Sequence, residues 1–143
     1  MDCKKLNEYL SNLAVLNAKL HNLHWNVKGI HFMEIHQFTE TLYNDFFEKY
    51  DEVAELLKMR GEKPLVKLSD YVQNASIKEL DENDFSSDEV IKIIQEDLNT
   101  MKNLATDIRN TVDKADDFEV VSMFEGHISG YSKNLWFIKS MLA

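Results

Sequence analysis

One histidine and three carboxylates share a face of the segment between residues 36 and 55. We place His36 at the origin of a helical projection that advances about 100° per residue. Glu40 then falls at about 40°, Asp51 at about 60° and Glu55 at about 100°, whereas the apolar stripe of this segment spans about 200–320°. These side chains therefore point away from the core. A charged, solvated helix face is one interpretation, and a set of metal ligands is the other.

A second histidine extends this face across a turn. His24 lies six residues before residue 30, and His36 lies six residues after it. Such positions sit side by side in an antiparallel helical hairpin, so we expect His24, His36 and Glu40 to converge. Two imidazoles and a carboxylate suit iron, zinc or manganese, whereas calcium and magnesium prefer shells of oxygen atoms. Two structural histidines are the alternative interpretation.

Asp51 and Glu55 cannot complete that set of ligands within one chain. Asp51 follows Glu40 by 11 residues, which is about 16 Å along a helix, while metal–ligand bonds are near 2 Å. Either two unrelated half-sites exist, or the same segment of a second subunit runs antiparallel across the first about a two-fold axis. In the second case, Tyr43 and Phe47 would supply apolar contacts.

Four apolar stripes with a helical period would position these residues. Gly29 and Gly61 follow the first two stripes and supply helix stops. Ser86 and Glu89 form a capping box that opens the third helix. The predicted helices cover about residues 4–28, 35–61, 86–112 and 116–142.

The connections between the predicted helices indicate the topology. Short turns join the first helix to the second and the third to the fourth, so each pair is an antiparallel hairpin. The 24 residues between Gly61 and Ser86 can span the ~40 Å length of a helix. One long crossover between two hairpins predicts an all-α, ferritin-like four-helix bundle. A short helical turn near residues 68–73 lies within the crossover.

A di-iron centre inside one four-helix bundle needs a Glu-x-x-His pair on each of two helices. No such pair occurs, and Glu125 and His127 are two residues apart and face different ways. We therefore do not expect a di-iron centre within a single chain.

The composition excludes several classes of protein. The 143 residues fit one domain, residues 1–143. Cys3 is the single cysteine and cannot form an internal disulfide, which favours a reducing, cytoplasmic setting. No apolar run approaches the ~20 residues that cross a bilayer. A formal net charge of −9 disfavours general nucleic-acid binding, because that binding neutralises phosphates.

A known family carries a similar run of residues over nearly the whole chain. The run His-Trp-Asn-Val-Lys-Gly at 24–29, then Phe32, His36 and Glu40, and Asp-Glu-Val-Ala-Glu at 51–55 closely resembles the signature of the Dps family, the dodecameric mini-ferritins. Leu-Trp-Phe-Ile at 135–138 extends the similarity. The resemblance implies a hollow homo-oligomeric shell of twelve four-helix subunits, with iron sites at two-fold interfaces.

The same resemblance assigns roles to particular positions. It implies iron ligands His24, His36 and Glu40 from one subunit and Asp51 and Glu55 from its partner. Trp25 and Trp136 match family tryptophans near the iron site, with core or interface packing as the alternative for Trp136. Two departures are present: Glu40 stands where the family often has aspartate, and Leu56 replaces an arginine that commonly supports the last glutamate. His21 is expected beside Glu40, and His127 is expected to be structural.

The activity implied by the resemblance is ferroxidation. Two Fe(II) ions per interface site would be oxidised together, preferably by hydrogen peroxide, and Fe(III) would be stored in the shell, which protects against oxidative stress. Zinc is the expected competitor, since a mixed imidazole–carboxylate site accepts Zn²⁺ at least as well as Fe²⁺.

Two other functions are alternatives. Some relatives coat DNA with lysine-rich tails, and a DNA-binding protein that protects by physical shielding is the first alternative. Here Lys4 and Lys5, at the start of the first predicted helix, are the only lysines at this end, so with the acidic net charge direct DNA binding is not expected. A plain helical interaction module is the second alternative.

Overall fold

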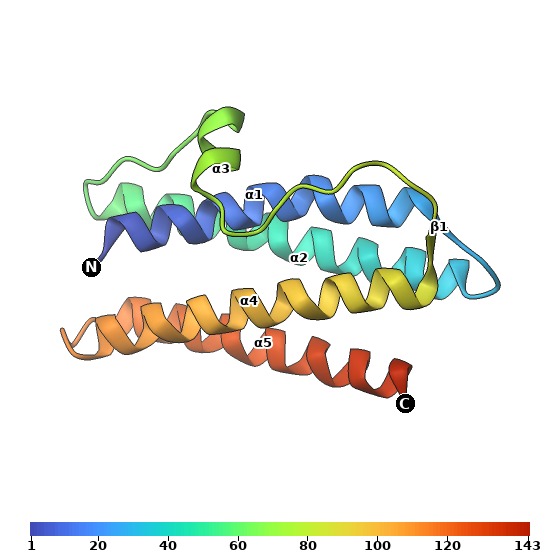
Figure 1. Ribbon diagram of the computed structural model, residues 1–143. Helices are drawn as coiled ribbons and strands as arrows, with labels where there is room; N and C mark the ends of the chain where they lie inside the picture. Colours follow the sequence, from blue (N-terminus) through green and yellow to red (C-terminus); the bar gives the residue numbers. More distant parts are fainter.

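Four long helices form two antiparallel hairpins, α1 with α2 and α4 with α5, joined by one long crossover (Figure 1). The computed structural model describes residues 1–143. The elements are α1 (Cys3–Asn26), β1 (Val27–Lys28), α2 (Phe32–Met59), α3 (Leu68–Asn74), β2 (Phe85–Ser86), α4 (Ser87–Asp113) and α5 (Phe118–Leu142). The predicted ferritin-like bundle and the short helix in its crossover are confirmed. None of the helices combines the length and apolar character needed to cross a membrane.

The first hairpin ends differently from the prediction. Helix α1 stops at Asn26 instead of continuing to residue 28, because Val27 and Lys28 leave the helix and pair in parallel with Phe85 and Ser86. This two-residue ladder joins the end of α1 to the start of α4, and the helical period alone gives no sign of it. Gly29 follows with φ +123°, a conformation that side chains rarely adopt, which explains the stop.

The predicted capping box opens α4 as expected. The Glu89 backbone N–H donates to Ser86 Oγ at 3.2 Å, and the Ser86 backbone N–H donates to Glu89 Oε2 at 2.8 Å. These reciprocal bonds satisfy two backbone donors that the helix itself leaves without partners.

The core fills the space among the four long helices. Of the predicted stripe on α2, Ile35, Leu42 and Phe46 are buried, while Phe38 and Tyr50 are half-buried. Three side chains of α2 outside the predicted stripe are buried as well, namely the polar Thr39 and Lys49 and the apolar Leu56.

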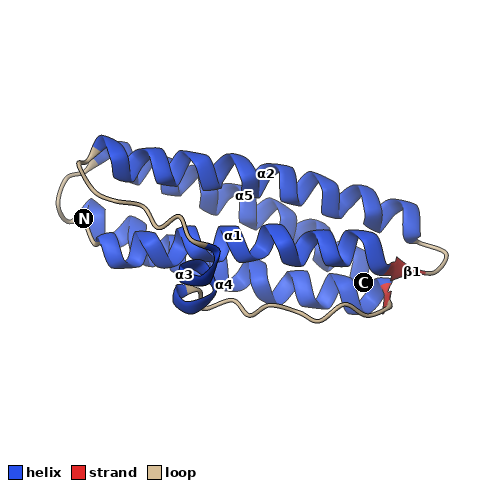
Figure 2. Cartoon of the chain, turned by 90° about the horizontal axis from the view of Figure 1, so that it is seen from above, coloured by secondary structure: helices blue, strands red, loops and turns tan.

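Three asparagines of α1 hold the crossover against the bundle. Figure 2 shows the crossover running alongside α1 between α3 and the strands. Asn12 is fully buried, and its side chain takes part in three hydrogen bonds to the crossover. The bonds are from Leu65 N–H to Asn7 Oδ1 (2.9 Å), from Ser76 N–H and Ile77 N–H to Asn12 Oδ1 (2.8 and 3.1 Å), from Asn12 Nδ2 to Ser76 Oγ (3.0 Å), and from Asn22 Nδ2 to the carbonyls of Leu80 and Asp81 (3.0 and 3.1 Å). Side chains of α1 thus replace the backbone partners that an irregular segment lacks.

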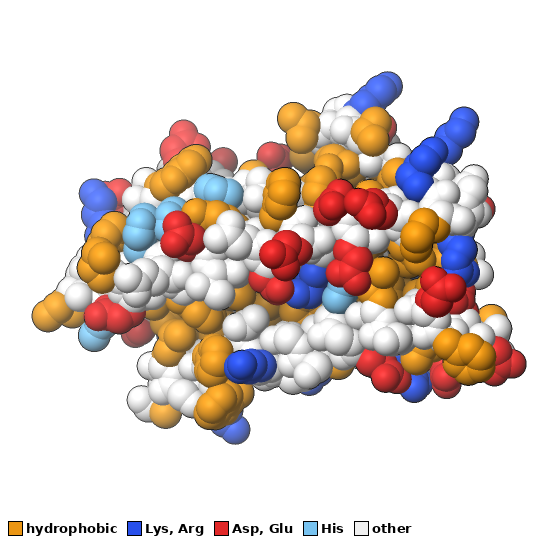
Figure 3. Space-filling model, turned by 180° about the vertical axis from the view of Figure 1, so that it is seen from behind, with side chains coloured by type: hydrophobic (Ala, Val, Ile, Leu, Met, Phe, Trp, Pro, Cys, Tyr) orange, Lys and Arg blue, Asp and Glu red, His pale blue; other side chains and the backbone are white.

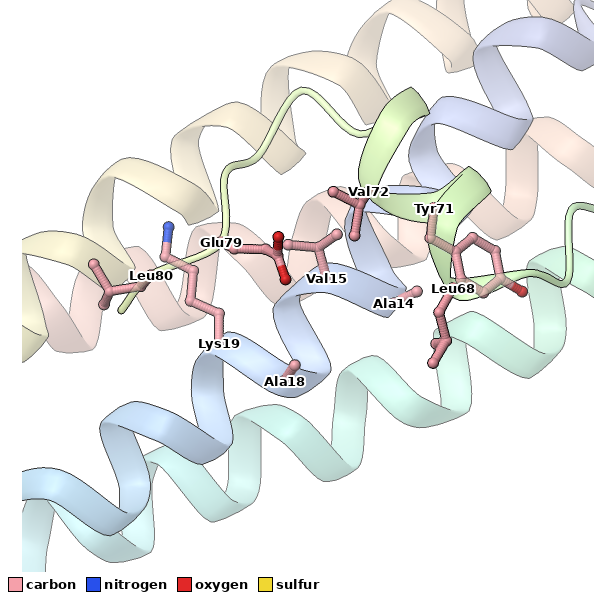
Figure 4. Close-up of a pocket in the computed structure, with 9 residues that line it drawn as sticks. All are labelled: Ala14, Val15, Ala18, Lys19, Leu68, Tyr71, Val72, Glu79 and Leu80. Atoms are coloured by element: carbon pink, nitrogen blue, oxygen red, sulfur yellow. The ribbon is translucent and has the colours of Figure 1, made fainter. Parts of the chain in front are cut away.

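A half-open groove of about 230 Å³ lies between α1 and the crossover (Figure 4). Its walls are mostly apolar and include Ala14 and Val15 of α1 and Leu68 and Val72 of α3. At one end, Lys19 forms an ion pair of 2.7 Å with Asp97 of α4, which ties the two hairpins together. None of the candidate metal ligands lines this groove.

The asparagine contacts predict unequal effects of two matched substitutions. Asn12→Ala leaves the N–H groups of Ser76 and Ile77 without an acceptor, so we expect a loss of about 3 kcal/mol in the free energy of unfolding. Asn22→Ala removes donors from carbonyls that water can reach, so the loss should be about 1 kcal/mol or less. Denaturant unfolding at one protein concentration measures both. Equal losses in the two variants would contradict this account of the crossover.

Candidate metal centre

His24 of α1 and His36 of α2 face each other across the first hairpin. Their rings stack with centroids 3.6 Å apart and planes 12° from parallel. Each ring is bonded to the backbone of the other residue: His24 Nδ1 lies 2.7 Å from the His36 carbonyl oxygen, and His36 Nδ1 lies 2.9 Å from the His24 carbonyl oxygen. The sequence prediction that these two histidines meet is confirmed.

These reciprocal bonds determine which nitrogen of each ring is available. A carbonyl oxygen only accepts hydrogen bonds, so each Nδ1 carries the proton and donates it. In a neutral imidazole, Nε2 then keeps its lone pair. Burial lowers the pKa of His24 below its ordinary value, which favours the neutral form. A histidine that donates Nδ1–H to a carbonyl and offers Nε2 is the usual arrangement of a metal ligand.

Thr39 is a supporting residue that the sequence analysis did not identify. It is fully buried, and His24 Nδ1 also lies 2.9 Å from Thr39 Oγ1, whose hydroxyl donates to the Ile35 carbonyl at 2.8 Å. The signal in the sequence is a polar residue three positions after His36 on the apolar stripe. A threonine there can hold a ring that lies on the neighbouring helix.

Glu40 stands one turn beyond His36 on the exposed side of α2. The Tyr43 hydroxyl donates to Glu40 Oε1 at 3.3 Å. The Tyr43 ring stacks on His21 at 3.9 Å and meets the edge of His24 at 5.2 Å. His21 is therefore linked to Glu40 through Tyr43 and forms no direct hydrogen bond or ion pair with it.

A single chain does not assemble a complete metal site. No three histidine, cysteine or acidic side chains converge on a common point, so the expected convergence of Glu40 with His24 and His36 does not form a three-ligand group in the isolated chain. Asp51 and Glu55 are exposed, and their side chains make no hydrogen bond or ion pair within the chain. Figure 3 shows histidines gathered at one end of this face, with acidic side chains distributed along it.

The remaining candidates are placed as follows. Trp25 is 68% exposed, with its ring 5.4 Å from that of His21. Trp136 is 62% exposed, so the alternative of core packing within the chain is wrong for it. Leu56 is 1% exposed, and its apolar side chain offers no donor to support Glu55.

The interior of the bundle offers no second candidate. Glu125 is exposed and pairs with Arg109 at 2.8 Å, while His127 is buried against Tyr9. The prediction that Glu125 and His127 face different ways is confirmed. Lys49 is buried in the same interior, and its ammonium group opposes the entry of a metal cation.

Comparisons with known proteins agree with this fold. Residues 3–143 match the family model described as a ferritin-like domain. The DNA protection during starvation protein of Helicobacter pylori strain J99 is 32% identical over 138 residues, which are 96% of each chain. The solved structure of Helicobacter cinaedi CAIP has a TM-score of 0.95 at 32% identity and covers 97% of both chains. A Dps protein from Bacillus brevis has a TM-score of 0.93 at 31% identity, covering 97% of this chain and 93% of its own.

The hydroxyl beneath His24 yields a prediction about metal affinity. Thr39→Val keeps the shape of the side chain but removes one of the two acceptors of His24 Nδ1–H. We expect Zn²⁺ to bind about tenfold more weakly, because the partners of a ligand's second nitrogen orient its ring. Thr41→Val is the matched control, since Thr41 is exposed and bonds only to its own helix. Calorimetric titration measures both, and equal affinities in the two variants would contradict the role of Thr39.

Proposed function

The chain belongs to the Dps family of ferritin-like proteins, and on that basis we propose that it is an iron-storing ferroxidase whose sites lie between subunits. Membership supports an iron-storage or DNA-protection role. The observation that carries the proposal is the His24–His36 pair, in which both Nδ1–H groups are bonded to carbonyls and both Nε2 atoms remain available. Two such histidines beside the exposed carboxylate of Glu40 are a donor set suited to Fe(II).

A partner subunit would complete each site. Asp51 and Glu55 lie on the same exposed face of α2 but too far along the helix to reach the histidines of their own chain. An antiparallel α2 from a second subunit would bring these carboxylates to the histidines, twice per dimer. Phe47 is 59% exposed between the two halves and would be covered in this arrangement. Twelve subunits in a closed shell would hold the stored iron.

The proposed reaction takes two Fe(II) ions and one molecule of hydrogen peroxide. Each Fe(II) gives up one electron, the O–O bond breaks, and two protons are taken up to form two water molecules. Because both electrons pass in one event, no hydroxyl radical is released. The Nε2 atoms of His24 and His36 would bind incoming Fe(II), and the carboxylates would stabilise Fe(III), which is a harder ion. Tyr43 orients Glu40 through its hydrogen bond, and the ring of Trp25 lies beside that of His21.

Charge favours iron chemistry over direct DNA binding. The names of relatives such as the Helicobacter pylori protein refer to DNA protection, and a DNA-shielding protein is therefore the second candidate. A formal net charge of −9 opposes contact with phosphates at neutral pH. Protection by removal of Fe(II) and peroxide needs no such contact. We place this activity in the cytoplasm, where a lone cysteine stays reduced.

The proposed site predicts a sharp difference between two histidines. His36→Ala should abolish the fast phase of Fe(II) oxidation by peroxide, because it removes a proposed ligand together with the hydrogen bond from its ring to the His24 carbonyl. His31→Ala is the control, since His31 is exposed and lies near Glu34 only, at 3.6 Å. Zn²⁺ added before Fe(II) should slow the wild-type reaction by competing for the same donors. Absorbance of Fe(III) followed by stopped flow measures each rate. Equal rates in both variants, with no effect of zinc, would place the chemistry elsewhere.

Mixing two inactive variants tests whether the site is shared. One variant carries His24→Ala with His36→Ala, and the other carries Asp51→Asn with Glu55→Gln. Each should form a shell of about 200 kDa, since none of the changes touches the apolar core, and each should lack fast oxidation. After dissociation and reassembly of an equal mixture, random pairing makes about half of the dimers mixed. A mixed dimer has both defects in one site and none in the other, so about a quarter of all sites should be intact.

Recovery of about a quarter of the wild-type rate is the expected result. Mass spectrometry of the reassembled shells verifies that subunits have exchanged. If exchange is complete and no activity returns, the ligands are not shared between subunits. A chain that stays a monomer or dimer under native conditions would contradict the shell.

A further inference from the structure

Four polar side chains form a hydrogen-bonded line through the interior of the bundle, apart from the proposed metal site. Tyr131 and His127 come from α5, Tyr9 from α1 and Glu52 from α2. The hydroxyl groups of Tyr131 and Tyr9 are hydrogen-bonded to each other. Tyr9 Oη lies 2.9 Å from His127 Nδ1, and His127 Nε2 lies 3.3 Å from Glu52 Oε2. Both tyrosines are fully buried, and Glu52 reaches the surface.

The position of each proton in this line follows from the acceptor at its end. Glu52 Oε2 accepts the hydrogen bond from His127 Nε2 at 3.3 Å, so Nε2 carries the proton that it donates. Burial lowers the pKa of His127 to about 3, so the ring is neutral and its Nδ1 has a lone pair. Tyr9 therefore donates to His127, and Tyr131 donates to Tyr9. The phenol of Tyr9 is held against a base inside an apolar core.

The charged groups around His127 act on it in opposite directions. The Lys49 ammonium pairs with Asp45, one turn before it, and lies 5.5 Å from the centroid of the Tyr131 ring. Together with Glu52, this group holds two carboxylates and one ammonium. Lys49 disfavours a positive charge on His127 and Asp45 favours one, and the Nε2–H of an imidazolium would keep its hydrogen bond to Glu52.

We propose that Tyr9 is a redox-active tyrosine, which gives an electron to one-electron oxidants while its proton passes to His127 Nδ1. The oxidant is the hydroxyl radical, which forms when peroxide meets a single Fe(II). Only this source of the radical depends on the proposed function. The hydroxyl radical gains one electron and a solvent proton and becomes water. Fe(II) then returns an electron to the Tyr9 radical and becomes Fe(III), while Nδ1 returns the proton to the phenol. The protein is thus restored, and one Fe(II) and one radical are consumed.

The geometry favours Tyr9 over the other buried phenols. Loss of an electron makes a phenol strongly acidic, so oxidation is easiest where a base can take the proton at once. Tyr71 provides a natural contrast, because it is also buried and bonded to a second tyrosine, Tyr50, at 2.6 Å. The Tyr71 hydroxyl donates to the Leu65 carbonyl at 2.6 Å, and a carbonyl cannot take its proton. The rings of Phe124 and Tyr131 adjoin Tyr9 and shield its radical from water.

The test uses the assembled protein without iron, so that its result is independent of ferroxidase activity. Photo-excited ruthenium tris-bipyridine with persulfate supplies the one-electron oxidant, and samples are frozen for electron paramagnetic resonance. We expect a tyrosyl radical in the wild type, loss of that signal in Tyr9→Phe, and an unchanged signal in Tyr71→Phe. His127→Gln should also lose the signal, because the amide can accept a hydrogen bond from Tyr9 but cannot take its proton.

Two variants keep the proposal falsifiable if one fails to fold. Chromatographic size and melting temperature identify a misfolded variant. If either Tyr9→Phe or His127→Gln misfolds, the radical signal of the other variant tests the proposal. A signal that persists in the folded variant, a signal lost equally in Tyr71→Phe, or no tyrosyl radical in the wild type would overturn the proposal. Absence of iron oxidation in the intact protein would contradict the ferroxidase function and leave the radical result unaffected.

Discussion

The candidate metal site depends on the two hydrogen bonds that His24 and His36 exchange with each other's backbone. Each bond fixes a ring, its protonated nitrogen and the register of α1 against α2 at the same time. A slide of one helix by a single residue would break both bonds. The short turn at Gly29 and the two-residue ladder of Val27 with Phe85 hold that register. The end of the hairpin is thus held by backbone and side-chain hydrogen bonds where the candidate ligands lie.

Much of this arrangement could be predicted from the sequence because it follows from periodic patterns. The apolar stripes locate four helices, Ser86 and Glu89 mark the start of α4, and equal distances from the turn bring His24 to His36. The exposed position of Asp51 and Glu55 also follows from the helical projection. Each of these features depends on residues close together in the chain, or on two residues that lie at equal distances from the turn of the hairpin.

Features that depend on distant partners could not be predicted in the same way. Thr39 and Lys49 interrupt the apolar stripe of α2, and only the neighbouring helices explain why polar groups are buried there. The sequence alone does not indicate that Asn12 is buried, because the crossover that covers it lies far away in the chain. The line from Tyr131 to Glu52 joins α5 to α1 and α2, which lie far from it in sequence. This polar interior also explains why the candidate metal ligands lie on the outside of the bundle, since Lys49 already supplies positive charge within.

The asparagine contacts of α1 have a consequence for how the crossover tolerates change. Its order comes from side chains of another element that bind its backbone, and the identity of its own exposed side chains contributes little. Substitutions at exposed positions such as Glu82 should therefore be neutral, and this stretch could vary freely among natural sequences or carry an inserted peptide. Proline at position 76 or 77 would be an exception, because it removes an N–H group that Asn12 holds. The crossover thus tolerates changes of its exposed side chains but requires the backbone N–H groups that bind α1.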